Sequence, residues 1–420
     1  MKASFASHKS HRGFAAAGAI MAVVLPATLF PVPAQELSAV QGGDAVRIVD
    51  AADPAHGARV RQLRKDDGHE HNLYHYRDPW NADGSRMVAI WSDLQQKNWQ
   101  VVLCDGDGRF LKRLFTIAEY DWRLVWDRRD PAILYTWKGA DLYRYDVNAG
   151  RAERLKSFAP GWLAPAGPSL NQAGDRILAI TNDHTLRSFR LPDMREERAF
   201  KADVPEGCFV DWGKPRYIGC RNLIALAYRS SDGARQALLV YDDTGRLVRK
   251  LDGVGGGGHY DFSPDGKLAY PKMPVVTRRG APAGPEPALE IRVVNLDGSD
   301  DRALFSAPRS KAAYVQNAHV TWPKKVNDWF VVSFFPIAGH LPDAYAPPLD
   351  EIMVLRLDGT ARYLARTGTA YSRSGPRGSS GDMFWAQPQA CPSADGRRIC
   401  FNSNRSGTID LHIVYPENLK

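Results

Sequence analysis

The chain has 420 residues and a formal net charge of +8, with 55 Lys and Arg residues against 47 Asp and Glu residues. The basic residues form no blocks and no stripe interleaved with aromatic residues, which argues against a nucleic-acid-binding protein. No stretch beyond residue 34 approaches the ~20 apolar residues of a membrane-spanning helix, so a soluble protein is expected.

The first 34 residues have the three-part layout of a secretory signal peptide. A basic start precedes an apolar run from Gly13 to Phe30, and Val32 and Ala34 stand before Gln35 at the −3 and −1 positions. The alternative, a membrane anchor, is disfavoured because proline residues interrupt and end the apolar run. We predict cleavage near Ala34 and a periplasmic or secreted protein. Cleavage removes three basic residues and no acidic one, which leaves 386 residues and a net charge of +5.

The cysteine pattern leaves the disulfide content open. The five cysteines are Cys104, Cys208, Cys220, Cys391 and Cys400. An oxidising compartment permits disulfides, and the pairs Cys208/Cys220 and Cys391/Cys400 each flank an expected hairpin turn. Diagonal positions on neighbouring strands often miss disulfide geometry, so neither bridge is assigned. The spacing contains no Cys-x-x-Cys pattern of a thiolate metal site.

From about residue 70 onward, short runs rich in Val, Ile, Tyr, Phe and Trp alternate with Asp-Gly-type turns, as β-strands and hairpins do. Clear strand runs in chain order are Met87–Ser92, Val101–Cys104, Ile133–Trp137, Ala237–Tyr241, Ile291–Val294, Phe330–Phe334 and Ile352–Leu357. They belong to a recurring unit of about 40–55 residues. Each unit carries an aromatic or apolar marker residue followed by a four-residue turn. The clearest copies are Trp80–Gly84, Phe262–Gly266 and Pro392–Gly396.

Seven such units begin near residues 70, 117, 158, 201, 253, 309 and 369. Four-stranded units arranged radially form a propeller, which leaves only short, protected sheet edges. We therefore predict an all-β protein, a seven-bladed β-propeller of four-stranded antiparallel blades over residues 70–420. Residues 35–69 are expected to form an N-terminal extension, in which Ala45–Asp50 supplies a strand that closes the ring. A pair of β-sandwiches is the alternative, and seven turn-marked copies argue against it.

One register rule applied to every unit predicts which side chains line the axial channel. In a propeller blade, the strand that precedes this turn is the innermost one, nearest the axis. Side chains alternate between the two faces of a strand. Residues three and five positions before the marker should therefore share the inward face. The third and fourth units place Gly167 and Phe209 there. The polar residues at these two positions are His75, Arg77, Asp121, Arg123, His259, Asn317, His319, Gln387 and Gln389.

A ring of Arg, His and amide side chains suits an anionic sugar, although hydrogen-bonded channel residues without a function are the alternative. Arginine offers a planar fork for carboxylate or sulfate, and neutral histidine takes a proton near pH 7 or binds a divalent metal. The same groups suit β-elimination on a uronic acid. In that reaction a cation neutralises the carboxylate, a base removes the neighbouring proton, and an acid protonates the departing oxygen.

The Ser-Pro-Asp-Gly turn within Phe262–Gly266 resembles those of the periplasmic Tol-type propellers. The same repeat appears in the oligogalacturonate lyases and, more loosely, in the ulvan lyases. The resemblance covers essentially the whole mature chain. Tol-type proteins carry an additional α/β domain ahead of the propeller, for which the stretch between Gln35 and the first blade leaves no room.

The resemblance to oligogalacturonate lyases implies roles for several residues. It places His259 at a catalytic position and His319 at the first ligand position of a manganese ion. The His-x-His ligand pair of that family corresponds to Gln387-Pro388-Gln389, and amides are poorer ligands for transition metals than imidazoles. A divalent metal is expected, with Mn²⁺, Ca²⁺ and Zn²⁺ all open.

The segment His69–Asp78 resembles the histidine-rich early blades of ulvan lyases. On a strand, His71 and His75 would share one face. A second catalytic histidine, which ulvan lyases carry about twenty residues later, has no counterpart here.

We expect a polysaccharide lyase that cleaves a uronic-acid-containing anionic oligo- or polysaccharide in the channel. The expected catalytic residues are His259 as base, His75 and Arg123. The expected substrate-binding residues are Arg77, His71, Asn317 and Gln387. The expected metal ligands are His319, which could instead transfer a proton, and Gln389. The alternative is a non-catalytic, Tol-like periplasmic propeller that binds a protein or glycan partner. A monomer without nucleic-acid partner or membrane span is expected in either case.

Overall fold

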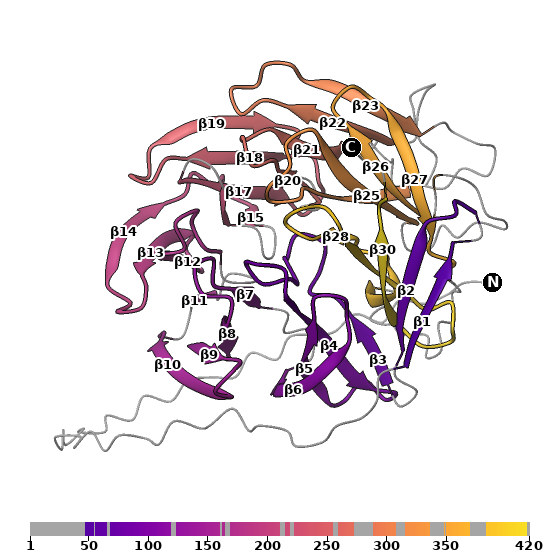
Figure 1. The fold of residues 1–420 in the computed structure, drawn as a ribbon. Coiled ribbons are helices and arrows are strands. Elements are labelled where there is room, and N and C mark those ends of the chain that lie inside the picture. The colour runs from indigo at the N-terminus through magenta and orange to yellow at the C-terminus, as the bar shows by residue number, and fades with distance from the viewer. Residues whose placement is uncertain are drawn as a thin grey trace, which may run out of the picture. The chain divides into compact units, whose positions relative to one another are not determined.

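The computed structural model describes residues 47–53, 55–64, 68–118, 123–159, 162–163, 169–210, 215–218, 222–254, 259–272, 289–307, 316–336, 348, 350–369 and 384–417. Over these ranges the strands form seven antiparallel sheets around a common axis (Figure 1). The predicted all-β fold and the predicted number of blades are therefore confirmed. Residues 384–386 form a helical turn.

The first blade consists of β3 (Gly68–His71), β4 (Arg86–Asp93), β5 (Trp99–Asp105) and β6 (Phe110–Ile117). The second consists of β7 (Leu124–Trp126), β8 (Ile133–Lys138), β9 (Asp141–Asp146) and β10 (Arg151–Ser157). The third consists of β11 (Trp162–Leu163), β12 (Arg176–Thr181), β13 (Thr185–Arg190) and β14 (Glu196–Lys201).

The fourth blade consists of β15 (Cys208–Val210), β16 (Arg216–Ile218), β17 (Leu223–Ser230), β18 (Gln236–Tyr241) and β19 (Leu247–Asp252), with both β15 and β16 paired to β17. The fifth consists of β20 (Asp261–Phe262), β21 (Leu268–Lys272), β22 (Leu289–Val294) and β23 (Arg302–Ala307). The sixth consists of β24 (Gln316–Thr321), β25 (Trp329–Pro336), β26 (Glu351–Arg356) and β27 (Ala361–Arg366).

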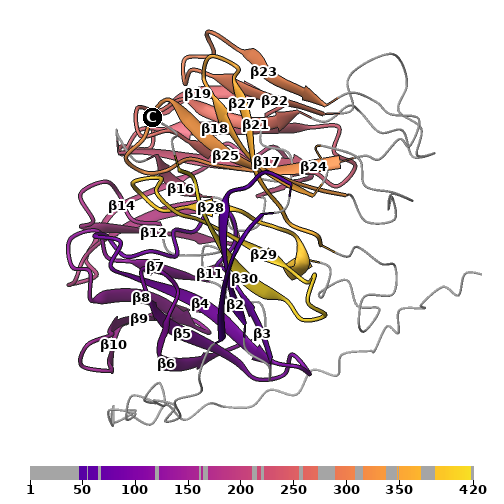
Figure 2. The same ribbon diagram turned by 45° about the vertical axis from the view of Figure 1, so that its right-hand side comes forward.

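The seventh blade joins the two ends of the described chain. It contains β28 (Cys391–Pro392), β29 (Ile399–Ser403) and β30 (Asp410–Tyr415), followed by β2 (Arg59–Arg64) and β1 (Arg47–Ala52). Strand β2 pairs with β30 (Figure 2), and β1 pairs with β2 on the outside (Figure 1). The strand expected to close the ring was Ala45–Asp50, but β2 is the one next to β30. Three arginines in β2 make it look unlike a buried strand in the sequence. In the structure, Arg61 binds Asp50 of β1 through two hydrogen bonds of 2.8 and 3.0 Å.

The blades pack through seven apolar clusters of described residues, one between each pair of neighbouring blades. Strand β4 shows how the sequence produces this arrangement. Met87 and Ala89 pack against the seventh blade, whereas Val88 and Ile90 pack toward the second. Because side chains alternate along a strand, a fully apolar strand can serve two interfaces.

The turn motif that marks each unit is explained by its hydrogen bonds. In the last blade, Ser393 Oγ donates to Asp395 Oδ1 at 2.7 Å, and the amide of Gly396 donates to the Ser393 carbonyl at 2.9 Å. Gly396 has φ of +71°, a conformation that favours glycine, and a Cβ there would come within 2.4 Å of Trp329 Cζ2.

The structure contains free thiols where a disulfide was considered. Cys391 and Cys400 face each other on β28 and β29, and both are buried and free. Their sulfur atoms have separate partners, the Arg77 carbonyl for Cys391 at 3.0 Å and the Asn72 side chain for Cys400 at 4.0 Å. Cys208 is also a buried free thiol, and Cys220 lies outside the described residues.

Among the described residues, no helix is both long and apolar enough to cross a bilayer. The proposed signal peptide lies outside the described residues, so it stays a prediction, as does the monomeric state.

Candidate functional site

Three histidines from three blades meet near the axis, and we call His75, His259 and His319 the imidazole cluster. Their ring centroids are 4.4 Å apart for His75 and His319, 4.5 Å for His259 and His319, and 5.7 Å for His75 and His259. His75 follows β3, His259 precedes β20, and His319 lies in β24. The structure thus brings together histidines that are up to 244 positions apart in the sequence.

The hydrogen bonds of Asn317 determine the tautomer of neutral His259. The amide of Ala318 donates to the side-chain oxygen of Asn317 at 2.8 Å, so the atom at this position must be an acceptor. The same oxygen lies 3.2 Å from His259 Nδ1, which must therefore carry the proton. Neutral His259 then has a lone pair on Nε2. His259 is half-buried, whereas His75 and His319 are buried, so His259 is the most exposed imidazole of the cluster.

The other two imidazoles are held more tightly. His75 is fully buried, and its Nδ1 lies 3.3 Å from the carbonyl oxygen of Val320, which can only accept. His319 is 1% exposed and stacks on Phe335 with a centroid distance of 4.4 Å. Its Nε2 lies 3.4 Å from the hydroxyl of Tyr74, a residue with φ of +95°.

The two glutamines of the seventh blade differ in their surroundings. Gln389 is fully buried, with Nε2 donating to the carbonyl of Phe384 at 2.7 Å. Its Oε1 has no hydrogen-bond partner among the described residues. Gln387 is half-buried, and its backbone N–H donates to the same carbonyl of Phe384 at 3.3 Å.

The described residues do not fit a transition-metal centre. No group of three His, Cys, Asp or Glu side chains in the described ranges is arranged to hold a metal ion. His75 and His319 lie nearly parallel, at 29°. Imidazole ligands direct an in-plane nitrogen lone pair at their ion, whereas these two rings face each other. These observations concern histidine and acidic side chains, so metal ligation by His319 together with the amide of Gln389 stays a prediction.

His71 lies in the core between blades. It is 1% exposed and stacks on Trp385 with a centroid distance of 3.8 Å, while its Nδ1 bonds the Asn72 carbonyl at 2.7 Å. Burial lowers the pKa of His71 to about 3. The prediction that His71 and His75 share one strand face is wrong, because β3 ends at His71 and Tyr74 has a positive φ.

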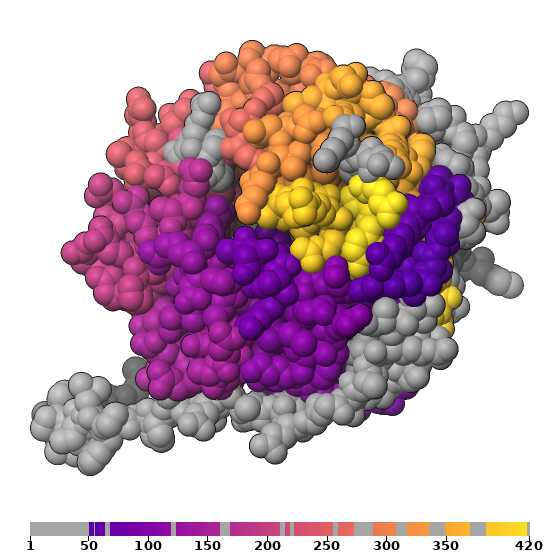
Figure 3. Space-filling view, in the orientation of Figure 1, coloured from indigo at the N-terminus to yellow at the C-terminus, as the bar shows by residue number. Residues whose placement is uncertain are grey.

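A second feature of the axis is a cavity of about 370 Å³ at the end of the channel where the marker turns lie. All seven blades contribute lining residues, and Figure 3 shows this face of the molecule hollowed near the axis. We call it the cationic cavity, after its basic lining residues Arg77, Arg128, Arg216, Lys324 and Lys325.

Of these five basic residues, only Arg77 was predicted from the sequence. Arg128 and Lys324 both stand two residues after their marker tryptophans, Trp126 and Trp322. Extending the register rule past the marker would therefore have found them. Arg216 follows an interrupted inner strand, and its position depends on tertiary contacts.

Paired charges and burial shape the cavity. Asp261 accepts hydrogen bonds from Arg216 at 3.2 Å and from Lys324 at 2.9 Å. Burial lowers the pKa of Arg77 to about 10, and the Arg216 cation adds to this shift. Burial raises the pKa of Asp78 to about 6, against the attraction of Lys324.

The remaining predicted residue, Arg123, immediately precedes β7 and is half-buried. The three residues that follow it, Leu124, Val125 and Trp126, line the cationic cavity. Asp121 lies outside the described residues.

Comparison with known proteins gives a likeness of fold. No family model matches the sequence, and no curated protein matches it. An oligogalacturonate lyase solved in complex with manganese superposes with a TM-score of 0.65 at 16% identity, over 89% of this chain and 97% of that one. An oligogalacturonate lyase from Vibrio parahaemolyticus superposes with a TM-score of 0.64 at 14% identity, over 90% of this chain and 99% of that one. The chain therefore shares the seven-bladed β-propeller fold of the oligogalacturonate lyases.

Proposed function

We propose that the protein is a polysaccharide lyase that cleaves a uronic-acid-containing glycan by β-elimination at the imidazole cluster. The observation that carries the proposal is the meeting of three imidazoles from three blades. They meet in a fold shared with oligogalacturonate lyases. Grouped imidazoles suit a reaction that both removes and returns a proton near neutral pH.

His259 is the proposed base. Its Nε2 removes the proton from the carbon next to the uronic carboxylate, and the electron pair of that C–H bond forms a carbon–carbon double bond. The bond to the glycosidic oxygen breaks, and this oxygen leaves with the electron pair and takes up a proton. We assign the donation of this proton to the stacked pair of His75 and His319, one of which carries an extra proton before the reaction, and the proton taken up by His259 passes to solvent afterwards.

The developing negative charge on the carboxylate needs a cation. We assign this part to Arg123, which stands at the register position of His259 and His319 in another blade, three residues before its marker. Gln387 contributes an amide for sugar hydroxyls. Asn317 orients His259 through its side-chain oxygen, and Gln389 holds the turn before β28 through its bond to Phe384. Because the described site does not fit a transition metal, no step is routed through one.

The test is turnover on a panel of polymers that includes polygalacturonate, ulvan, alginate and glycosaminoglycans. The wild-type protein is expected to form unsaturated product on at least one of them, seen as ultraviolet absorbance of the conjugated double bond. His259→Ala is expected to reduce the rate by at least 100-fold, in the range for loss of a general base. His184→Ala, in a turn of the third blade, is the matched control and should keep the activity.

Two outcomes would contradict the proposal. Wild-type protein that is inert on the whole panel would do so, as would a His259→Ala variant with full activity. Glycan binding without any product would favour the alternative, a propeller that only binds its partner. Product from ulvan alone would favour the resemblance of His69–Asp78 to ulvan lyases, which stays a prediction.

A further inference from the structure

We infer that the cationic cavity is a second ligand site, specific for a small anion that carries a carboxylate, sulfate or phosphate group. This site is separate from the imidazole cluster, and the inference goes beyond the proposed lyase activity. Its volume of about 370 Å³ falls within the range of small-molecule pockets.

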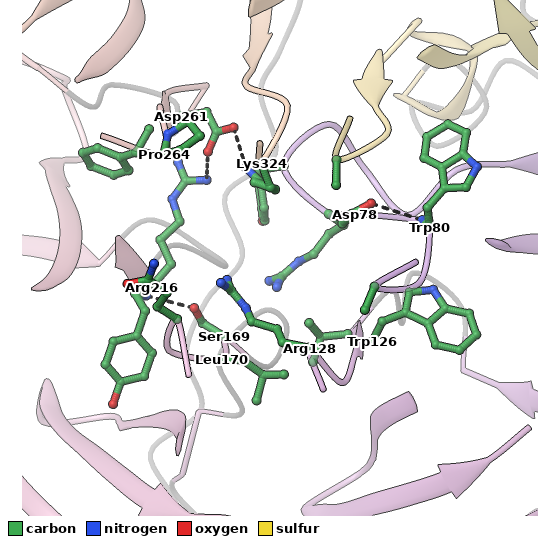
Figure 4. A pocket seen from close by; sticks show the side chains of 18 of the residues that line it. Asp78, Trp80, Trp126, Arg128, Ser169, Leu170, Arg216, Asp261, Pro264 and Lys324 are labelled. Atoms are coloured by element: carbon green, nitrogen blue, oxygen red, sulfur yellow. Dashed lines mark hydrogen bonds and ion pairs between the residues drawn. The ribbon is translucent and has the colours of Figure 1, made fainter. Parts of the chain in front are cut away.

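The position of the cavity on the axis gathers basic side chains from four different blades. Arg77 comes from the first blade, Arg128 from the second, Arg216 from the fourth, and Lys324 and Lys325 from the sixth. Figure 4 shows Arg128, Arg216 and Lys324 around the same space. Like charges gathered in a partly enclosed space repel one another, and a bound anion would relieve that repulsion.

The acidic residues of the lining do not balance these five cations. The carboxylate of Asp261 already accepts hydrogen bonds from Arg216, from Lys324 and from the backbone amide of Trp322, the last at 2.8 Å. Asp127 bonds within its own blade, accepting from the Tyr135 hydroxyl at 2.8 Å. Asp78 is the third carboxylate of the lining, so an excess of positive charge faces the cavity.

Arg128 is the lining residue best placed to bind an anion. Its side chain makes no hydrogen bond or ion pair with another described residue, and its electrostatic attraction is to Asp78. Arg128 is exposed at the cavity. A guanidinium presents its N–H donors in a planar fork, which matches two oxygens of a carboxylate, sulfate or phosphate.

Aromatic contacts hold two other guanidinium groups in place. The ring of Tyr76 lies 4.9 Å from the guanidinium carbon of Arg77 and 5.2 Å from that of Arg216. Arg216 also packs over the ring of Tyr260 at 4.3 Å. Such cation–π contacts fix the arginines before a ligand arrives, which lowers the entropic cost of binding.

The cavity and the imidazole cluster have different linings. None of His75, His259 and His319 is among the described residues that line the cavity. The anion would therefore bind to side chains other than the three imidazoles.

The experiment is isothermal titration of the full chain at low ionic strength with inorganic phosphate, sulfate and galacturonate in separate arms. The wild-type protein is expected to bind at least one of these, with an affinity that falls as salt rises. A preference for galacturonate would identify an anionic sugar as the ligand, whereas equal binding of phosphate or sulfate would identify a free oxyanion.

Arg128→Gln is expected to weaken this binding by at least about tenfold, because it removes a charge-assisted, two-point contact. Arg397→Gln, at an arginine whose side chain is 85% exposed on a turn of the seventh blade, is the matched control and should bind as the wild type does. His259→Ala should also keep the anion affinity, which separates this inference from the proposed lyase activity. Wild-type protein that binds none of the three anions, or an Arg128→Gln variant with unchanged affinity, would overturn the inference.

Discussion

At the scale of single residues, the contact between Asn317 and His259 connects the structure most closely to chemistry. The Asn317 oxygen accepts from the Ala318 amide and from His259 Nδ1, at 2.8 and 3.2 Å. This arrangement keeps the lone pair of neutral His259 on Nε2. Asn317 acts through His259 and is therefore a positioning residue.

Substitution of Asn317 tests this role. Asn317→Ala is expected to lower kcat about tenfold with little change in KM, because the imidazole loses the partner that fixes its tautomer and its orientation. Asn317→Asp should restore most of kcat, since an aspartate oxygen also accepts from both donors. Equal rates for the alanine and aspartate variants would show that the contact has no part in positioning His259.

Single residues were predictable from the sequence where the local repeat determines them. The register rule selected His75, which stands five residues before its marker, and His259 and His319, which stand three residues before theirs. The prediction of His71 as a substrate-binding residue came instead from the resemblance of His69–Asp78 to ulvan lyases, and it took strand periodicity to continue past the end of β3. Arg216 was missed, since its place in the cavity depends on contacts with Tyr76 and Tyr260 of other blades.

At the scale of elements, strand β2 decides whether the ring is closed. Val60 packs between the sixth and seventh blades, and Leu63 packs between the seventh and the first. One strand from before the first blade thus contributes to both interfaces of the last blade. Leu63 is fully buried, and a Cβ at Gly108 would come within 2.6 Å of its Cδ1.

Truncation of Leu63 therefore has a predictable cost. Leu63→Ala is expected to lower the free energy of unfolding by about 2–5 kcal/mol, the range for buried leucines that leave a cavity. Leu111→Ala is the control, because that side chain is 50% exposed on the outer strand of the first blade. Urea unfolding measures both variants, and equal stabilities would show that β2 does not hold the ring closed.

The order of the strands within each blade was predictable from the sequence. The strand that closes the ring, β2, was harder to predict. A marker residue followed by a turn recurs in every unit, most clearly at Trp80–Gly84, Phe262–Gly266 and Pro392–Gly396, so the spacing of these turns counts the blades. The closing strand has no turn marker of its own, and three of the six residues in its sequence Arg-Val-Arg-Gln-Leu-Arg are charged. Arg59 and Arg61 face the ring of Tyr415 on β30, at 4.6 and 5.8 Å, a contact that only pairing with the far end of the chain creates.

At the scale of the whole molecule, stability depends on pH through buried neutral histidines. Burial lowers the pKa of His71 to about 3 and that of His412 to about 3, from an ordinary value near 6.5. The unfolded chain therefore binds more protons than the folded one between these values. Their contribution to stability is complete above about pH 6.5 and is lost as the pH falls toward 3.

The expected loss is about 1.4 kcal/mol per pH unit for each of the two histidines below pH 6.5. Urea unfolding at pH 7 and pH 5 measures it. His412→Phe should remove the part of this pH dependence that comes from one histidine. Phenylalanine is chosen because His412 stacks on Phe401 with a centroid distance of 5.0 Å, and another aromatic ring keeps that contact. A variant with the same pH dependence as the wild type would contradict the assignment.

The most direct test of the account is mass spectrometry of the products released from a uronic-acid polymer. If the protein cleaves by β-elimination at the imidazole cluster, the products are unsaturated oligosaccharides. They lack one water relative to products of hydrolysis, because elimination adds no water to the broken bond. Saturated products, or an intact polymer after incubation with every substrate of the panel, would contradict it.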